Sequence, residues 1–262
     1  MKIAVSGSNG FIGNAIVTKL SEYFTIIPIP KGIDLESFFT ENKVDVLIHC
    51  ATVVTDKNSD ILNNNILYSN DLLKYAMRDN IVFLNLDTTA YYYRNNPYSL
   101  SKKIFRDTLL GLYRERSINL LLELVYGSNE NMQRFIPQQI SNLLQHKSID
   151  MTMGTQTRNI IHIDDVVEGI KSILLNIDNL LNIKHEIYVA SEDSITIKHL
   201  MNILIQLTES DSTIHFGKIQ YSDQENINTI VNNEFFITKI HKPEVDLVSG
   251  LKNIVEEIKK VY

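Results

Sequence analysis

One short segment near the start of the chain restricts the fold more than any other. Gly7, Gly10 and Gly13 form a G-x-x-G-x-x-G pattern, with Ser8, Asn9, Phe11 and Ile12 between them. The apolar run Lys2–Ser6 predicts a buried strand before this loop, and an amphipathic stretch through about Tyr23 predicts a helix after it. Such glycines let a backbone approach a pyrophosphate, whose charge then lies on the free N–H groups of the helix. A glycine turn without a ligand is the alternative, and the strand, loop, helix order favours the ligand site.

The rest of the chain predicts a parallel sheet followed by a smaller half. Apolar runs that indicate further strands lie at Thr25–Ile29, Val44–Cys50, Ile81–Leu86 and Leu120–Tyr126. Helical patterns between most of them cover residues 35–42, 62–78 and 99–116, and such alternation is typical of α/β folds. After Tyr126 the pattern breaks into shorter pieces, with helices expected over residues 132–145, 164–175, 196–208 and 245–260.

Composition excludes several classes of function. The formal charge of −6 provides no basic field for nucleic acid. The single cysteine, Cys50, excludes an internal disulfide framework, and no run of about 18 apolar residues is present to span a bilayer. Glycines after Val5 interrupt the only apolar run that resembles a signal peptide. We therefore expect a cytoplasmic protein with no membrane partner, no nucleic-acid partner and no metal site.

The end of the predicted second strand bears on the choice of dinucleotide. NAD enzymes place a carboxylate there to bind the adenosine ribose, whereas this chain has Lys31. Lys31 favours NADP(H), because it can meet a 2′-phosphate, although a solvated surface lysine is the alternative. Asp34 and Leu35 are candidates to lie beside the adenine ring of the cofactor, and Asp34 serves equally well as a helix N-cap.

A second constellation carries candidate catalytic groups. Tyr98 and Lys102 stand four residues apart, so a helix places them on one face. A fixed positive charge makes a phenol more acidic, which proton exchange with a carbonyl near neutral pH requires. Thr89 follows the strand Ile81–Leu86, at the sheet edge where open α/β folds bind ligands. Its hydroxyl is a candidate to bond the reacting oxygen, with Thr88 as the competing choice and a turn-forming threonine as the alternative for either.

Together these segments resemble the extended short-chain dehydrogenase/reductase family, in its nucleotide-sugar epimerase/dehydratase/reductase branch. The matching motifs are Ser6–Gly13, the segment His49–Thr52, the helix pattern from Asn65 to Asn70, Leu86–Tyr93, and Asn96–Lys102. The resemblance implies a Rossmann-type doubly wound parallel sheet with a smaller C-terminal substrate-binding α/β subdomain. It assigns residues 1–128 with 159–183 to the dinucleotide-binding domain and 129–158 with 184–262 to the subdomain.

The resemblance also implies roles for individual residues. Thr89, Tyr98 and Lys102 become the catalytic set, while Cys50, Ala51 and Thr52 lie along the cofactor and Asn65 braces the active site. In the second half, Val125–Gly127, Phe135–Pro137 and Thr155–Asp165 match family motifs and make Tyr126, Phe135 and Arg158 substrate-binding candidates. Arg158 suits bidentate contacts to a substrate diphosphate. The alternative is an ion pair with Asp164 or Asp165.

Departures from the family pattern narrow the expected reaction. Dehydratases carry an Asp-Glu pair after the catalytic threonine, where this chain has Ala90 and Tyr91. The compact length and the segment Leu122–Gly127 are most similar to small CDP-paratose and CDP-abequose synthase-like 4-keto reductases. We therefore expect NADPH-dependent reduction of a nucleotide-linked 4-keto-6-deoxy sugar, for surface polysaccharide sugar biosynthesis.

Two other functions stay open at this point. A nucleotide-sugar 4-epimerase uses the same catalytic set with bound NAD, and a non-catalytic dinucleotide-sensing protein keeps the glycine loop alone. The fold does not choose between them. Relatives often dimerise through the helix that carries Tyr98, so a homodimer is possible here. Leu109, Leu110 and Leu112 would then contribute to its interface. Burial in the core is the alternative for these leucines.

Overall fold

The computed structural model describes residues 1–54, 58–92, 96–221, 228–229 and 232–261. The chain divides into two compact units, which are described separately. Unit 1 comprises Met1–Leu122 and Val167–Val189, and unit 2 comprises Glu123–Val166 and Ala190–Tyr262. Tyr93, the last residue of the motif that begins at Leu86, lies outside the described residues.

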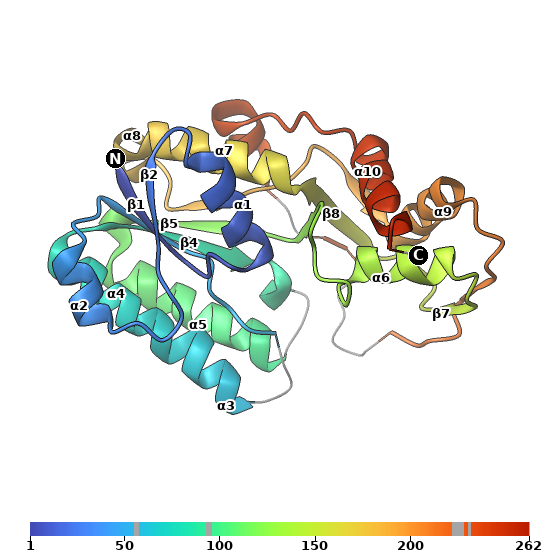
Figure 1. Cartoon of the computed structure of the whole chain (residues 1–262), viewed down its shortest axis with the longest axis horizontal. Helices are drawn as coiled ribbons and strands as arrows, with labels where there is room; N and C mark the ends of the chain where they lie inside the picture. Colours follow the sequence, from blue (N-terminus) through green and yellow to red (C-terminus); the bar gives the residue numbers. More distant parts are fainter. Residues whose placement is uncertain (55–57, 93–95, 222–227, 230–231, 262) are drawn as a thin grey trace. The chain divides into compact units, whose positions relative to one another are not determined.

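Unit 1 is built on one six-stranded parallel sheet (Figure 1). Its strand order is β2-β1-β3-β4-β5-β9, so the order reverses between β1 and β3, where open α/β sheets bind ligands. The strands are β1 (Lys2–Ser6), β2 (Thr25–Pro28), β3 (Val46–His49), β4 (Val82–Thr88), β5 (Ser117–Leu122) and β9 (Glu186–Tyr188). The predicted Rossmann-type fold is confirmed.

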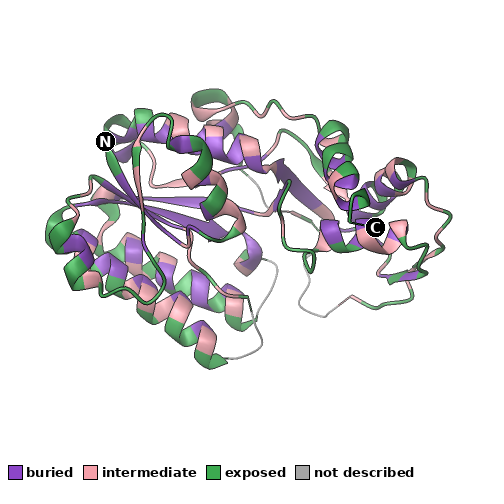
Figure 2. Cartoon of the chain, in the orientation of Figure 1, coloured by how far each residue is buried: buried purple, intermediate pink, exposed green. Residues whose placement is uncertain are grey.

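Helices cover both faces of this sheet. Figure 1 shows α1, α7 and α8 on one face and α2, α4 and α5 on the other. The helical segments of unit 1 are α1 (Phe11–Leu20), α2 (Leu35–Glu41), α3 (Asn58–Ile61), η1 (Leu62–Leu67), α4 (Tyr68–Asp79), η2 (Ala90–Tyr92), α5 (Pro97–Leu112), η3 (Arg114–Arg116), α8 (Ile177–Leu181) and most of α7 (Ile163–Leu175). The central strands are consequently buried on both sides, as Figure 2 shows, and every residue of β3, β4 and β5 is buried.

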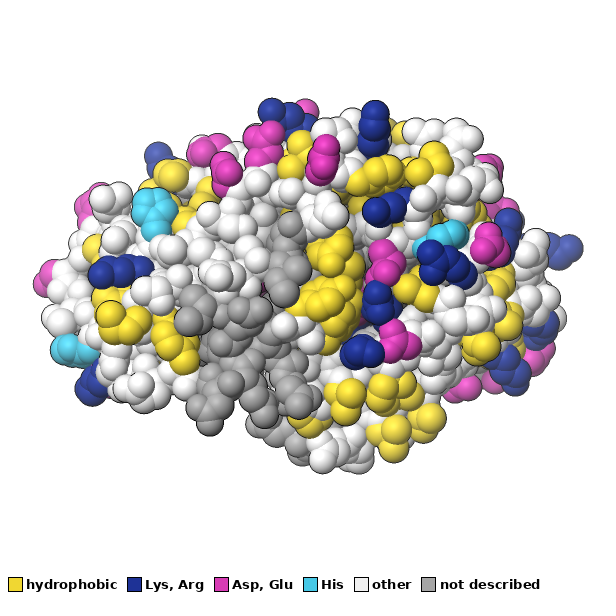
Figure 3. All heavy atoms as spheres, turned by 180° about the vertical axis from the view of Figure 1, so that it is seen from behind, with side chains coloured by type: hydrophobic (Ala, Val, Ile, Leu, Met, Phe, Trp, Pro, Cys, Tyr) yellow, Lys and Arg dark blue, Asp and Glu magenta, His cyan; other side chains and the backbone are white. Residues whose placement is uncertain are grey.

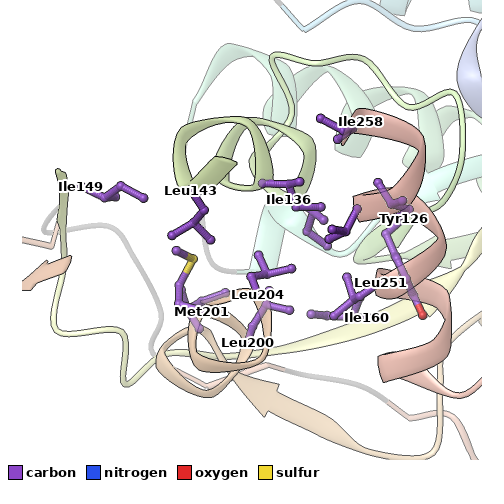
Figure 4. Close-up of a cluster of buried hydrophobic side chains, with 14 of the residues drawn as sticks. Tyr126, Ile136, Leu143, Ile149, Ile160, Leu200, Met201, Leu204, Leu251 and Ile258 are labelled. Carbon is purple, nitrogen blue, oxygen red and sulfur yellow. The ribbon is translucent and has the colours of Figure 1, made fainter. Parts of the chain in front are cut away.

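Unit 2 combines two small sheets with three helices that share one core. β8 (Thr157–His162) pairs in parallel with β6 (Leu124–Tyr126) and antiparallel with β10 (Ser194–Thr196). β7 (Ile149–Met151) and β11 (Ile214–Phe216) form a parallel pair. The helical segments are α6 (Phe135–Leu144), α9 (Ile197–Thr208), η4 (Phe236–Ile240) and α10 (Leu247–Lys259). Figure 4 shows their apolar side chains, among them Leu143, Leu204 and Leu251, interleaved in one buried cluster.

The unit boundaries differ from the domain boundaries expected from the sequence. Residues 123–128 and 159–166 fall in unit 2 instead of the dinucleotide-binding domain, because β6 and β8 pair with each other. Residues 184–189 fall in unit 1 instead of the subdomain, because β9 extends the parallel sheet beside β5. The single predicted strand Leu120–Tyr126 was therefore wrong: it is two strands, β5 and β6, in different sheets.

Charged side chains are distributed without a single-sign field on the face shown in Figure 3. Lys and Arg side chains there are interspersed with Asp and Glu side chains. This mixture agrees with the scattered charges and the net charge of −6 in the sequence. In the part of the chain that the structure describes, no helix is both long and apolar enough to cross a membrane.

Candidate active site

The glycine loop closes tightly against its neighbours. Gly7 has φ +68°, and a Cβ atom there would lie 2.6 Å from the backbone nitrogen of Ala51. A Cβ atom on Gly13 would lie 2.1 Å from the carbonyl oxygen of Gly7, and this oxygen also accepts the N–H of Gly10 at 2.9 Å. Side chains at positions 7 and 13 are therefore excluded by the backbone itself, as a loop that approaches a pyrophosphate requires.

The start of α1 offers backbone donors to an anion. Gly10 is the N-cap and contributes no side-chain hydrogen bond, and the first turn holds no acidic residue. Residues of this turn therefore leave the positive end of the helix dipole available to an anion. Of the loop side chains, Ser8 is buried, Asn9 is exposed, and Phe11 and Ile12 are half-buried. These residues fit the pyrophosphate of a dinucleotide.

The residues after β2 take different roles. Lys31 is exposed in a turn beside Gly32, which has φ +79°. The carboxylate of Asp34 caps α2, because its Oδ2 atom accepts the Ser37 N–H at 2.9 Å and the Ser37 hydroxyl at 2.7 Å. These bonds lower the pKa of Asp34. Asp34 is thus the N-cap of α2, the alternative that the sequence left open, and the next residue, Leu35, is half-buried.

The segment after β3 runs past Asn65. The side-chain Oδ1 of Asn65 accepts the N–H of Val53 at 2.8 Å and the hydroxyl of Thr52 at 3.2 Å. Cys50 and Ala51 are half-buried and Thr52 is exposed. Burial raises the pKa of the Cys50 thiol to about 12, against the opposing effect of the Lys102 charge. This shift favours the protonated thiol at neutral pH.

The start of α5 sets the position of Tyr98 and Lys102. Asn96 and Ser99 form a capping box, with Pro97 at the first helical position, so the helix begins one residue before Tyr98. Lys102 follows one turn later and is 4% exposed, and its Nζ donates to the carbonyl of Leu86 at 2.7 Å. Burial lowers the pKa of Lys102, and the neighbouring carboxylate of Asp87 opposes this shift.

The two candidate threonines differ in how their hydroxyls are used. Thr88 Oγ1 accepts the N–H of Ala90 at 3.1 Å. Thr89 is 2% exposed, and its backbone N–H donates to the carbonyl of Leu122 at 2.9 Å. Within the described residues its Oγ1 atom is buried and has no hydrogen-bond partner. A buried hydroxyl without a partner is uncommon, so Thr89 is a candidate to bind an oxygen atom of a ligand.

Asp87 is a site residue that the sequence reasoning missed. It is 4% exposed on β4, and its Oδ2 accepts the amide of Asn119 at 2.9 Å and the hydroxyl of Tyr91 at 3.2 Å. Burial raises the pKa of Asp87, while the charge of Lys102 lowers it. The available signal was a carboxylate near the end of a largely apolar strand, directly before the two threonines.

In unit 2, Arg158 lies beside a second buried carboxylate that the sequence reasoning also missed. The Nε atom of Arg158 is 3.8 Å from Oε1 of Glu123, and the two side chains are 7% and 2% exposed. The other carboxylate oxygen of Glu123 accepts the N–H of Asn159 at 2.8 Å and the hydroxyl of Thr229. Asp165, one of the alternative partners expected for Arg158, accepts hydrogen bonds from His241 and from two backbone N–H groups.

The other two substrate-binding candidates belong largely to the core of unit 2. Tyr126 is 1% exposed and meets the ring of His162 edge-on, and Phe135 begins α6 and packs against the same cluster. A cavity of about 490 Å³ borders Tyr126, and its acidic lining residues are Asp165, Glu192, Asp193, Glu244 and Asp246. Its lining includes neither Arg158 nor Phe135, and five carboxylates do not suit a diphosphate. Among the residues described, no group of three or more His, Cys, Asp or Glu side chains could hold a metal ion.

Comparison with known proteins identifies the family. The sequence profile of the NAD dependent epimerase/dehydratase family matches residues 3–190. The chain is 25% identical over 295 residues to CDP-abequose synthase from Salmonella typhimurium, with 98% of each chain covered. It is 26% identical over 208 residues to dTDP-D-glucose 4,6-dehydratase from Dictyostelium discoideum, with 65% of this chain and 48% of that protein covered.

Solved structures share the fold along the whole chain. UDP-glucuronic acid 4-epimerase from Bacillus cereus, in complex with NAD, superimposes with a TM-score of 0.86 at 20% identity, covering 100% of this chain and 98% of that one. GDP-mannoheptose C4 reductase from Campylobacter jejuni, with NADP bound, gives a TM-score of 0.81 at 17% identity, covering 99% and 98%.

Proposed function

Because the chain belongs to the NAD dependent epimerase/dehydratase family, we propose that it reduces the 4-keto group of a nucleotide-linked 6-deoxy sugar with NADPH. The observation that carries this proposal is the buried Thr89 hydroxyl, which has no partner among the described residues and lies at the end of β4. A carbonyl oxygen of the substrate would complete its hydrogen bonding. The same proposal places the protein in the cytoplasm, in the synthesis of sugars for surface polysaccharides.

The catalytic residues have complementary tasks in this reduction. The bound dinucleotide would supply the hydride. Thr89 and Tyr98 donate hydrogen bonds to the 4-keto oxygen, and the Tyr98 phenol then gives its proton to that oxygen as the alcohol forms. The Lys102 ammonium has three N–H donors, of which Leu86 takes one, so it can also hold the nicotinamide ribose. A positive charge near a phenol makes it a stronger acid, which is the effect that we propose for Lys102 on Tyr98.

We assign the cofactor contacts to residues of unit 1 and the substrate contacts to residues of unit 2. The glycine loop and the start of α1 would hold the pyrophosphate, and Lys31 would meet the 2′-phosphate of NADPH. Unit 2 would bind the nucleotide sugar, with Arg158 on the diphosphate. Glu123 lies 3.8 Å from the Arg158 guanidinium, so we propose that it orients this side chain for the substrate.

Two observations favour a reductase over a dehydratase. Ala90 has no acid–base group, and the Tyr91 hydroxyl is bonded to the buried carboxylate of Asp87. The positions that carry the dehydratase Asp-Glu pair are thus occupied by residues that do not supply it. The similarity to CDP-abequose synthase over nearly the full length of both chains supports the small-reductase assignment.

A 4-epimerase is the second candidate. It is favoured by the B. cereus 4-epimerase in complex with NAD, whose fold matches this chain with a TM-score of 0.86. An epimerase retains its cofactor and consumes none overall, so cofactor consumption separates the two reactions.

Paired valine variants test the role of Thr89. Thr89→Val removes the unpartnered hydroxyl with little change of shape, and kcat/KM should fall by about 100-fold or more. Thr88→Val removes a hydroxyl that is already bonded to Ala90, so its effect should be much smaller. A Thr89→Val enzyme with full activity, or a larger loss in Thr88→Val, would contradict the assignment.

A further inference from the structure

A series of buried hydrogen bonds begins at the last residue of β1. The hydroxyl of Ser6 lies 2.7 Å from Nδ1 of His49 on β3, and Nε2 of His49 lies 2.8 Å from the hydroxyl of Ser69 on α4. These three residues are 0%, 1% and 1% exposed. Ser6 directly precedes the glycine loop, so the series starts beside the cofactor site.

The donors and acceptors fix the direction of these bonds. The Ser69 hydroxyl has one hydrogen, which it donates to the carbonyl oxygen of Asn65 at 3.1 Å. It must therefore accept from Nε2–H of His49. A neutral imidazole has one N–H, so Nδ1 accepts the hydroxyl hydrogen of Ser6. Burial lowers the pKa of His49 to about 3, and the charge of Lys102 acts in the same direction.

The series continues from Asn65 to the catalytic helix. The amide nitrogen of Asn65 donates to the carbonyl of Val53 at 2.9 Å and to the hydroxyl of Ser101 at 3.1 Å. Ser101 in turn donates to the carbonyl of Tyr98 at 2.7 Å. One continuous set of bonds thus connects the strand before the glycine loop to the backbone of Tyr98.

An irregular helical turn lies in the middle of this series. Residues 62–67 form a π-helix, and the N–H of Tyr68 bonds to the carbonyl of Asn63 five residues earlier. Single π turns inside helices are rare and concentrate at functional sites. Asn65 lies within this irregular turn, and its carbonyl oxygen accepts the hydroxyl of Ser69 on α4. His49 and Ser69 together therefore hold the backbone that carries the Asn65 amide.

We propose that His49, held as the Nε2–H tautomer by Ser6 and Ser69, is a positioning residue that sets Tyr98 for proton transfer through Asn65 and Ser101. This inference rests on the proposed role of Tyr98. It adds to the family pattern, which assigns a bracing role to Asn65 alone. The position before the glycine loop must then carry a hydroxyl, and Ser6 fulfils this condition.

The ring of His49 also has a packing role, which the experiment must separate from its hydrogen bonds. It meets Phe83 and Phe105 edge-on at centroid distances of 5.9 and 5.5 Å. A phenylalanine at position 49 would keep these contacts and lose both hydrogen bonds. His49→Phe is accordingly the variant that removes the proposed function of the ring and preserves its packing.

The first arm of the test measures the tautomer without any substrate. Nitrogen NMR of the full chain, labelled in its seven histidines, distinguishes protonated from unprotonated ring nitrogens, and His49→Phe identifies the signals of His49. We expect hydrogen on Nε2 and no titration between about pH 5 and 9. Hydrogen on Nδ1, or titration within this range, would overturn the proposal.

The second arm measures turnover in variants that each lose one buried hydroxyl. Ser69→Ala and Ser6→Ala should lower kcat by roughly tenfold or more at saturating cofactor and substrate, with cofactor Kd within about twofold of wild type. Ser6→Thr keeps the hydroxyl and should retain kcat. Ser117→Ala is the matched control, because Ser117 is 0% exposed and, among the described residues, its hydroxyl donates only to the carbonyl of Arg114.

The outcomes separate this inference from the proposed function. If Ser69→Ala and Ser117→Ala have the same kcat, His49 only stabilises the fold and the inference is wrong. If the wild-type protein reduces no 4-keto sugar, the proposed function is wrong, whereas the NMR arm still decides the tautomer. Turnover as an epimerase would then serve to compare the serine variants.

Discussion

Replacing Gly13 with alanine tests whether close packing at the glycine loop is required. The new Cβ atom would lie 2.1 Å from the carbonyl oxygen of Gly7, and an ordinary contact begins at 3.4 Å. The backbone must therefore move by the difference, about 1.3 Å, and the oxygen concerned also closes the turn to Gly10. Overpacking of this kind costs about 1–3 kcal/mol of stability. We expect the free energy of unfolding of Gly13→Ala to fall by that amount.

The same displacement moves the loop that would hold the cofactor pyrophosphate. Dinucleotide Kd, measured by calorimetry, should rise by at least about tenfold in Gly13→Ala. Gly111→Ala is the control. Apart from its own helix, no described residue has a heavy atom within 4 Å of the Gly111 Cβ position in α5, and alanine there should stabilise by about 0.4–1 kcal/mol. Denaturant unfolding of both variants provides the stabilities. A Gly13→Ala protein with wild-type stability and wild-type affinity would refute the reasoning.

The remaining predictions concern pH and cofactor choice. Burial raises the pKa of Glu130 to about 7, although the charge of Arg134 opposes the shift. The unfolded chain releases this proton near the ordinary value of 4.5, so the free energy of unfolding should fall by on the order of 3 kcal/mol between pH 4.5 and 7. Glu130→Gln should remove this slope in denaturant unfolding at both pH values, and an unchanged slope would contradict the assignment. Lys31→Ala should raise KM for NADPH roughly tenfold and leave KM for NADH unchanged, because only NADPH carries the 2′-phosphate. Lys43→Ala, at another exposed lysine, should change neither constant.

The first strand, the glycine loop and the helix that carries Tyr98 could be predicted because their signals are local. β1 occupies the predicted residues Lys2–Ser6. The start of α5 follows from three nearby residues: Asn96 and Ser99 form the capping box, and Pro97 occupies the first helical position. The hydrogen bonds of this capping box join residues only three positions apart. Asp34 shows the same principle, since its cap partner Ser37 lies three residues away.

The split of the predicted strand Leu120–Tyr126 could not be predicted from its own residues. Its seven residues are apolar except Glu123, so the pattern indicates one buried strand. The chain changes sheets at Glu123, where β6 pairs with β8, and the hydrogen-bond partners of this carboxylate, Asn159 and Thr229, lie far along the sequence. Periodicity contains no information about such partners.

The polar interior of unit 1 was missed for a related reason. Sequence patterns treat His49 and Asp87 as exceptions in apolar strands, because a polar residue is buried only where partners satisfy it. Those partners, Ser69 for His49 and Asn119 for Asp87, come from other elements. The glycine, tyrosine and lysine motifs indicated a candidate site, but the bonds that would fix its geometry could be found only in the folded chain.

The central claim is that this protein transfers reducing equivalents from NADPH to a nucleotide-linked 4-keto-6-deoxy sugar. The most direct test incubates the purified protein with NADPH and a panel of such sugars and follows the absorbance of the cofactor. We predict that NADPH is oxidised in proportion to one of these sugars, and that Tyr98→Phe abolishes the reaction. No cofactor oxidation with any ketone, together with NAD that remains bound through purification, would contradict the claim and identify an epimerase instead.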